Sequence, residues 1–264
     1  MLRTALGIFT FFFGTTVSGL QCVFARMRGI PDTPGGPYDR ASRRWCRWLC
    51  EAAGATIEIH GREHIDEVHP HVYVANHVSW YDIFTLGQVL PHQKFVAKSE
   101  LRSFPLFGWA ATAWGVVWIE REHRRNAFAA YETAARQIGE GVSVVVFPEG
   151  TRGDHYELRQ FKKGPFVLAI ASGVPIVPTL IYGAREVNPR GTVRIRPGTV
   201  HLHFLPAIQT AGLTYDDRND LARRTRDAVA QCLADTYDIH SVPSEYVRPT
   251  PGVSPAAPAV LSQT

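Results

Sequence analysis

Cysteine is scarce in this chain of 264 residues, and the spacings that would give it a chemical role are missing. The four cysteines form no C-x-x-C pair, and no histidine cluster follows them at the spacing of a zinc site. Cys46 and Cys50 stand one helical turn apart, where packing is the simpler role. We therefore expect free thiols in a reducing compartment.

Motifs that define several other functional classes are also absent. The sequence has no G-x-S-x-G motif, so it lacks the nucleophile elbow of the serine hydrolases. It has no long basic run, and its net charge of +4 is a mild excess that suits phosphates or acidic lipid surfaces. We expect no nucleic-acid partner, because no nucleic-acid-binding motif accompanies that charge.

Histidine is more plentiful, but its distribution does not predict a metal site. His201 and His203 would lie on one face of a strand, and no third ligand is evident beside them. The other histidines that could serve as ligands are His60, His64, His69 and His71. We therefore predict no metal site and no resident cofactor.

Charged residues are absent from residues 4–25, an apolar segment flanked by Arg3 and Arg26. The segment is long enough to cross a membrane, although threonines, serine and glycines dilute its hydrophobicity. A secretory signal peptide is the competing interpretation, but no convincing small-x-small cleavage site is present. We expect a retained membrane segment that either spans or half-inserts.

A linker rich in proline and glycine, residues 30–38, leads into a basic amphipathic helix over residues 42–53. Its apolar stripe consists of Trp45, Trp48, Leu49 and Ala52. Tryptophan beside arginine is typical of a helix at headgroup depth, and the alternative is a helix docked on the core with its arginines in water. We predict that the first 54 residues contain a membrane-docking helix pair.

The rest of the chain alternates between apolar, β-prone runs and helical periodicity, with no internal repeat. The predicted strands are Ala55–His60, Val72–Ala75, Lys94–Ala97, Gly115–Ile119, Val142–Phe147, Ile176–Ile181 and Val200–Phe204. The predicted helices are Trp80–Leu90, Pro105–Thr112, Arg124–Ile138, Gly164–Ala171 and Asp217–Ala234. This order indicates an α/β fold, a mostly parallel sheet flanked by helices.

Three segments follow from this pattern. Residues 1–54 hold the membrane-associated helices, and residues 55–240 form one globular domain with ample apolar material for a core. Residues 241–264 form a tail whose prolines lie among small residues, and we expect it to be disordered.

His77 follows the predicted strand Val72–Ala75, and Asp82 lies in the first turn of the next helix. A carboxylate at this spacing can fold back onto the imidazole, fix its tautomer and leave the other nitrogen free to take a proton. The alternative is structural: Ser79 and Asp82 resemble a capping box, and His77 would then be an ordinary loop histidine.

Four short blocks extend this first motif through the chain. They are Asn76-His77-x4-Asp82, Gly115-Val-Val-Trp-Ile-Glu-Arg121, Phe147-Pro-Glu-Gly-Thr-Arg152 and Val174-Pro-Ile-Val-Pro178. In this order and spacing the chain resembles the glycerolipid acyltransferase family, specifically bacterial 1-acyl-glycerol-3-phosphate acyltransferases, from Thr56 to Pro206. Trp118 replaces the usual phenylalanine of the second block, and Gly153 replaces the serine that often ends the third.

The resemblance implies that His77 is a general base, Asp82 its orienter, and that no acyl-enzyme is needed. The expected substrate-binding residues are Asn76, Lys98, Arg121, Glu149, Gly150, Thr151 and Arg152. Arginine binds phosphate bidentately, Glu149 could hold a hydroxyl or pair with an arginine, and backbone N–H groups around Gly150 could stabilise an oxyanion.

The implied activity is transfer of a fatty acyl group from acyl-CoA or acyl-carrier protein to the sn-2 hydroxyl of 1-acyl-glycerol-3-phosphate. This lysophosphatidic acid acyltransferase reaction gives phosphatidic acid. The implied partners are the phospholipid membrane, a lysophospholipid acceptor and the acyl donor, at the cytoplasmic face of a bacterial inner membrane.

Three alternatives remain open for the same residues. The acceptor could be another lysolipid, such as lyso-ornithine lipid. Water could replace the acceptor, which would make the protein a thioester or lipid-ester hydrolase. The chain could also be a non-catalytic membrane-binding module, although such a module has no need of a base and its orienter, His77 and Asp82.

Overall fold

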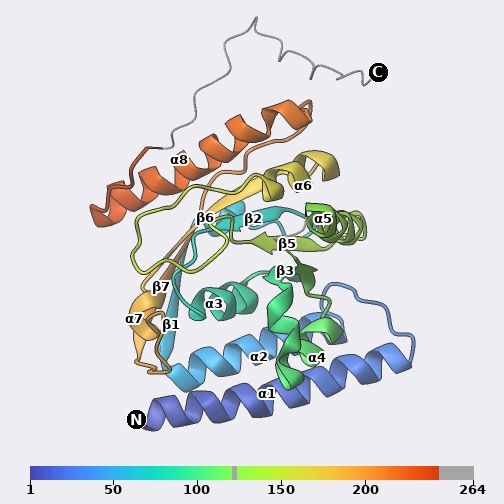
Figure 1. Cartoon of the computed structure of the whole chain (residues 1–264). Helices are drawn as coiled ribbons and strands as arrows, with labels where there is room; N and C mark the ends of the chain where they lie inside the picture. The colour runs from blue at the N-terminus through green and yellow to red at the C-terminus, as the bar shows by residue number, and fades with distance from the viewer. Residues whose placement is uncertain (121–123, 244–264) are drawn as a thin grey trace, which may run out of the picture.

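The computed structural model describes residues 1–120 and 124–243, and side chains of helix α5 from Ala130 onward. Its sheet has the strand order β1-β7-β6-β2-β5-β3-β4 (Figure 1). All neighbouring strands are parallel except β6 and β7, which are antiparallel. The predicted α/β fold with a mostly parallel sheet is therefore confirmed.

The strands are β1 Ala55–His60, β2 Val72–Ala75, β3 Gln93–Lys98, β4 Val117–Ile119, β5 Ser143–Val146, β6 Ile176–Tyr182 and β7 Gly198–Phe204. The helices are α1 Leu2–Met27, α2 Pro37–Ala53, α3 Tyr81–Val89, α4 Pro105–Ala113, α5 Arg124–Gly139, α6 Gly164–Ser172, α7 Ala184–Val187 and α8 Arg218–Tyr237. Helices α1 to α4 cover one face of the sheet, and α5, α6 and α8 cover the other (Figure 1).

The two central strands are buried along their whole length, which explains their continuous apolar sequence. Tyr73 of β2 and Val145 of β5 pack into the core on the α2–α4 side. Val74 of β2 and Val146 of β5 pack into the core beneath α5 and α6. The carboxyl ends of β2 and β5 therefore lie side by side, and the loops that leave them meet at one edge.

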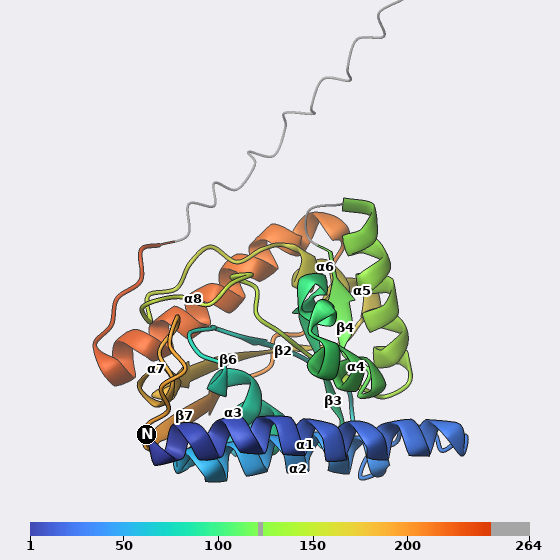
Figure 2. The ribbon, with the colours of Figure 1, turned by 60° about the horizontal axis from the view of Figure 1, so that its bottom comes forward.

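Helices α1 and α2 lie side by side along one face of the molecule (Figure 2). Small residues allow the close approach of α1: a Cβ at Gly14 would meet the Trp45 ring at 2.9 Å, and one at Gly19 would meet the Trp109 ring at 2.6 Å. Helix α1 is long and apolar enough to cross a membrane by length and composition. The large side chains on its other face are exposed, among them Phe9, Phe12, Phe13, Leu20 and Phe24.

The apolar stripe of α2 faces the core. Trp45 is only 3% exposed and packs against Trp114, with ring centroids 4.6 Å apart, and Leu49 is 2% exposed. The interpretation of α2 as a helix with its stripe at headgroup depth is therefore wrong, and the stripe docks on the core. The reason is that α1 covers α2 and takes the outer position itself. Of the three arginines expected in water, Arg47 is exposed, whereas Arg43 and Arg44 are half-buried.

Element boundaries differ from the predicted ones by a few residues. The largest shift is at α2, which begins at Pro37 inside the predicted linker, because proline suits the first turn of a helix. The short helix α7 was not predicted. The four cysteines are free thiols, and three of them are buried. Most of the predicted disordered tail, residues 244–264, lies outside the described residues.

Candidate active site

His77 and Asp82 are in direct contact at the carboxyl end of β2. His77 Nδ1 lies 2.7 Å from Asp82 Oδ2, and the Asp82 side chain is completely buried. The same oxygen accepts hydrogen bonds from the backbone N–H groups of Val78 at 2.6 Å and Ser79 at 2.8 Å. With Nδ1–H donating to this carboxylate, the lone pair on Nε2 is left to accept a proton.

The two interpretations of Asp82 are therefore not exclusive, because the carboxylate holds both the loop amides and the imidazole. Ser79 Oγ donates to the Asn188 carbonyl at 2.8 Å and accepts from the Tyr81 N–H at 3.2 Å. This hydroxyl is buried and shapes the entry to α3, which is a structural role.

Phe147 supports the His77 ring from the neighbouring strand. The two rings are stacked, with centroids 4.0 Å apart and planes 16° from parallel. The His77 side chain is 12% exposed, so the ring is confined but accessible. Phe147 opens the third sequence block but was assigned no role from the sequence. Its position at the end of the strand next to β2 was the feature that could have indicated contact with His77.

Glu149 ties the turn after β5 to the turn after β2. Its Oε1 accepts the His77 backbone N–H at 3.2 Å, and the Gly153 N–H donates to the His77 carbonyl at 2.7 Å. Burial raises the pKa of the Glu149 carboxyl to about 7, against the opposing effect of hydrogen bonds from the His77 and Arg159 backbones. Gly150 closes the turn in the left-handed conformation, with φ of 80°.

The Gly150 N–H donates to the Phe147 carbonyl at 3.1 Å. This N–H is therefore used within the turn, whose tight geometry follows from the left-handed conformation of Gly150. The role of the N–H groups around Gly150 in stabilising an oxyanion stays a prediction. Thr151, the next residue, is exposed at the rim.

Arg152 lies next to the His77–Asp82 pair. Its guanidinium sits over the Trp80 ring, 4.5 Å from the centroid. Partial burial lowers the pKa of Arg152, as does the nearby Arg190, while Asp82 acts in the opposite direction. Arginine still stays charged at neutral pH, so the rim carries a fixed positive charge beside the imidazole.

The remaining predicted site residues have different outcomes. Lys98 ends β3 at the same edge of the sheet and is half-buried. Arg121 lies outside the described residues. Asn76 is buried: its Nδ2 donates to the Ile181 carbonyl at 3.0 Å, and its Oδ1 accepts the Ile181 N–H at 2.7 Å. Its predicted role in substrate binding is wrong, because its amide is used to join β2 to β6.

A large apolar cavity of about 760 Å³ lies between the sheet and the first four helices. Trp80 and Tyr81, which directly precede Asp82 in sequence, form part of its wall, and Phe11 and Phe12 of α1 form another part. Other lining residues include Trp45, Phe84, Phe95, Phe104, Phe107 and Trp114. Its size and lining are those of a site for a long apolar ligand.

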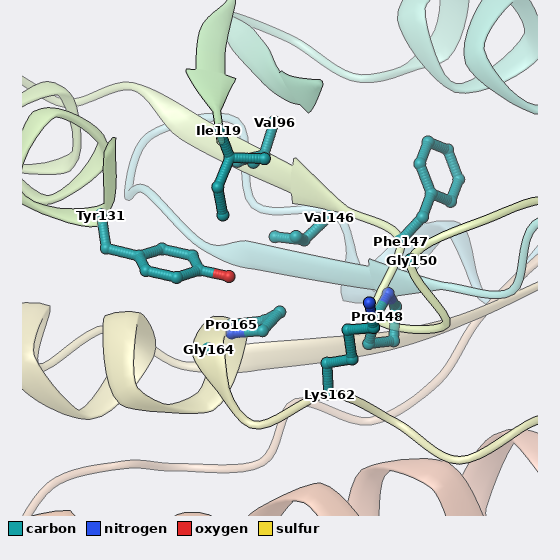
Figure 3. Close-up of a pocket in the computed structure, with 10 residues that line it drawn as sticks. All are labelled: Val96, Ile119, Tyr131, Val146, Phe147, Pro148, Gly150, Lys162, Gly164 and Pro165. Atoms are coloured by element: carbon teal, nitrogen blue, oxygen red, sulfur yellow. The ribbon is translucent and has the colours of Figure 1, made fainter. Parts of the chain in front are cut away.

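A second, smaller cavity of about 220 Å³ lies on the other side of the Phe147–Gly150 turn. Figure 3 shows the Tyr131 ring reaching into it above Gly164 and Pro165, and Lys162 extending toward the turn. The turn that carries Glu149 thus borders the smaller cavity directly, through Phe147, Pro148 and Gly150.

Comparison with known proteins agrees with this architecture. Residues 56–182 match the family model described as Acyltransferase. The chain is 34% identical over 178 residues to human 1-acyl-sn-glycerol-3-phosphate acyltransferase alpha, an alignment that covers 67% of this chain and 63% of the human protein. It is 31% identical over 227 residues to the lyso-ornithine lipid O-acyltransferase of Pseudomonas aeruginosa, covering 80% of this chain and 84% of that one.

Among solved structures, the 1-acyl-sn-glycerophosphate acyltransferase PlsC of Thermotoga maritima has the same fold, with a TM-score of 0.72 at 24% identity. That match covers 91% of this chain and 98% of the other. The chain belongs to the acyltransferase family, and the predicted family is confirmed.

Proposed function

We propose that this protein is a membrane-associated O-acyltransferase that acylates the sn-2 hydroxyl of 1-acyl-glycerol-3-phosphate with a fatty acyl group from acyl-CoA or acyl-carrier protein. The observation that carries the proposal is the 2.7 Å contact between His77 and Asp82, beside the fixed charge of Arg152 and the apolar cavity that starts at Trp80. The family membership supports the reaction type.

His77 Nε2 takes the proton of the acceptor hydroxyl as its oxygen attacks the thioester carbonyl. A C–O bond forms, the C–S bond breaks, and the departing thiolate receives the proton from the imidazolium. Asp82, with three donors on one oxygen, holds the ring in place and stabilises the imidazolium while it exists.

Arg152 supplies positive charge for the acceptor's phosphate, and Lys98 and Arg121 are proposed to add to it. Glu149 is proposed to accept a hydrogen bond from the acceptor's glycerol part, because it faces the His77 backbone. The apolar cavity is proposed to hold a fatty acyl chain, which would leave the thioester carbonyl near Trp80 and the imidazole.

The test is the replacement His77→Ala in an acylation assay with 1-acyl-glycerol-3-phosphate and acyl-CoA. We expect kcat to fall by about 100- to 10,000-fold, the usual contribution of a general base. His69→Ala is the matched control, because the His69 side chain is 76% exposed and pairs with Asp66 in a similar way. Full activity in His77→Ala would remove the mechanism. Fatty acid release that ignores added lysolipid would instead identify a hydrolase.

Lyso-ornithine lipid is a second candidate acceptor. It is favoured by the Pseudomonas aeruginosa relative, whose match extends over 84% of that protein, compared with 63% for the human one. A panel of both acceptors, each with acyl-CoA and acyl-carrier protein donors, separates the two. With an acceptor that lacks a phosphate group, Arg121→Ala should leave the activity unchanged. With 1-acyl-glycerol-3-phosphate, the same replacement should lower the activity.

Membrane association is proposed to act through the outer face of α1. Phe9 and Phe13 on this face stack on each other, with centroids 5.7 Å apart, and both are more than half exposed. The free thiols fit the cytoplasmic face of a bacterial inner membrane. The double variant Phe9→Ser/Phe13→Ser should bind vesicles at least roughly tenfold more weakly, from the apolar area lost.

The control for membrane binding is Tyr215→Ser. Tyr215 is also exposed, but it precedes α8, on the opposite side of the sheet from α1 (Figure 1). Vesicle sedimentation measures the membrane binding of the native chain, the double variant and Tyr215→Ser. Undiminished binding of the double variant would show that the membrane contact lies elsewhere.

A further inference from the structure

Four side chains that the proposed reaction does not use gather on one face of β1 and β7. Glu58 lies opposite His201 in the parallel register, and His60 lies opposite His203. Residues two apart on a strand point to the same face, so the four side chains form a compact square. Their strands lie at the edge of the sheet, with β6 between them and the catalytic strand β2.

Three of the four side chains bring ligand atoms to one point. His201 Nδ1 lies 3.3 Å from His60 Nε2 and 3.3 Å from a carboxylate oxygen of Glu58, and the three atoms are all within 4.8 Å of one another. In a tetrahedral zinc site with Zn–N distances of about 2.0–2.1 Å, neighbouring ligand atoms are about 3.3–3.4 Å apart. Two of the three separations therefore already have the length that a shared ion requires.

A proton satisfies this arrangement poorly. One hydrogen on His201 Nδ1 can point either at His60 or at Glu58, so it satisfies only one of the two contacts within the cluster. A cation at the centre would meet the lone pairs of both imidazoles and the charge of the carboxylate at once. Imidazole and carboxylate ligands together suit a divalent transition metal.

The fourth side chain, His203, holds the ligands from behind. Its ring stacks on His60, with centroids 4.2 Å apart and planes 11° from parallel, and its Nε2 lies 2.7 Å from the Tyr237 hydroxyl of α8. Tyr237 in turn stacks on Tyr182 of β6. The stacked His203 ring, held by Tyr237 of α8 and through it by Tyr182 of β6, limits the orientations of the His60 ring.

We propose that Glu58, His60 and His201 form a binding site for a divalent transition-metal ion, with Zn²⁺ as the best fit. Glu58 and His60 are exposed, so an ion can enter from solvent, and three protein ligands leave a position for water. A bound ion would link edge strand β1 to β7. The absence of a third ligand was what argued against a metal in the sequence, and the structure supplies Glu58 and His60 from β1.

The test is Zn²⁺ titration by isothermal calorimetry, with the full chain in detergent, purified without a polyhistidine tag and freed of metal by a chelator. We expect one ion per chain and at least tenfold weaker binding in His201→Gln. His155→Gln is the control, because His155 is exposed and stands outside the cluster, and its affinity should be unchanged. Equal affinity in His201→Gln and the native chain would overturn the proposal, as would no Zn²⁺ binding to the native chain.

Three further readouts separate lost binding from unfolding and report on the geometry of the site. Zn²⁺ should raise the melting temperature of the native chain but not that of Glu58→Gln or His60→Gln. Acyl transfer by these variants should stay within twofold of the native rate, because the cluster lies apart from His77. Co²⁺ in place of Zn²⁺ should give tetrahedral visible absorption bands in the native chain. A zinc-dependent shift that persists in both variants would place the ion elsewhere.

Discussion

Two of the molecule's groupings of histidine with carboxylate carry the proposed functions, and the chain builds them in different ways. His77 and Asp82 are five residues apart and meet within one loop and the start of a helix. His60 and His201 are 141 residues apart and meet only because β1 pairs with β7. The first grouping is a local feature of the sequence, and the second is a product of the sheet.

Their environments differ as much as their origins. The Asp82 side chain is completely buried and its oxygen accepts from two backbone N–H groups as well as the imidazole, so it has one orientation. The Glu58 side chain is 54% exposed and can rotate. A buried carboxylate with three donors on one oxygen suits the orientation of a base, whereas an exposed one suits capture of an ion from water.

The largest expected effect is the difference between Asp82→Asn and Glu58→Gln in acyl transfer. In Asp82→Asn the new amide oxygen could still accept from the Val78 and Ser79 N–H groups, but a neutral amide would not stabilise the imidazolium. We expect kcat to fall by about 100- to 10,000-fold in Asp82→Asn and by less than twofold in Glu58→Gln. Steady-state assays at saturating donor measure this. Similar losses in both variants would show that the two groupings do not differ in function.

The local features of the site could be predicted from the sequence. The apolar runs of β2 and β5 and the helical period after Trp80 place His77 and Asp82 at a strand end and a helix start. Parallel strands bring their carboxyl ends to one edge, which accounts for the meeting of Arg152 with this pair. These three residues could be placed from the sequence because each lies within a few positions of the end of a strand or the start of a helix.

Features that depend on pairing across the sheet could not be predicted. Asn76 bonds to Ile181, 105 residues away, and nothing near Asn76 in the chain indicates that partner. The register of the histidine cluster comes from the parallel β1–β7 pair, whose strands lie far apart in the chain. The antiparallel β6–β7 pair has the same apolar composition as a parallel pair, so its direction could not be predicted either. The direction of the α2 stripe was equally ambiguous, because a stripe with Trp45 suits both a lipid surface and a protein core.

A smaller effect is expected when the charge at the catalytic edge is removed while the base is kept. Arg152→Ala should raise the KM for the phosphate-bearing acceptor about 10- to 100-fold, the range of a hydrogen bond to a charged group. Arg152→Lys should recover part of the loss, since lysine keeps the charge but not the flat contact with Trp80.

The control for this prediction is Arg223→Ala. Arg223 lies on α8, where it pairs with Asp220 and Asp227. Its removal should leave the acceptor KM unchanged. If Arg152→Ala also leaves the acceptor KM unchanged, other cations hold the phosphate, and Arg152 has no role in acceptor binding.

The smallest expected effect concerns the pH dependence of stability. The Glu149 carboxyl has a pKa of about 7 in the folded protein, raised by burial from an ordinary value of 4.5. Between these values the folded chain holds one proton more than the unfolded chain, so the unfolding free energy should fall as pH rises, by at most about 1.4 kcal/mol per unit. Glu149→Gln removes this contribution, because glutamine does not titrate but can still accept the His77 N–H.

Denaturant unfolding at pH 5, 6 and 7 checks this through the difference between native protein and variant, which cancels the other titrating groups. The profile of Glu149→Gln should be flatter than that of the native chain, and Glu157→Gln, at an exposed position, should leave it unchanged. Parallel profiles for native protein and Glu149→Gln would mean that this carboxyl titrates normally. A carboxyl whose pKa is raised by burial, with the charge of Asp82 acting in the same direction, gives the expected slope, so the result distinguishes the buried Glu149 from the exposed Glu58.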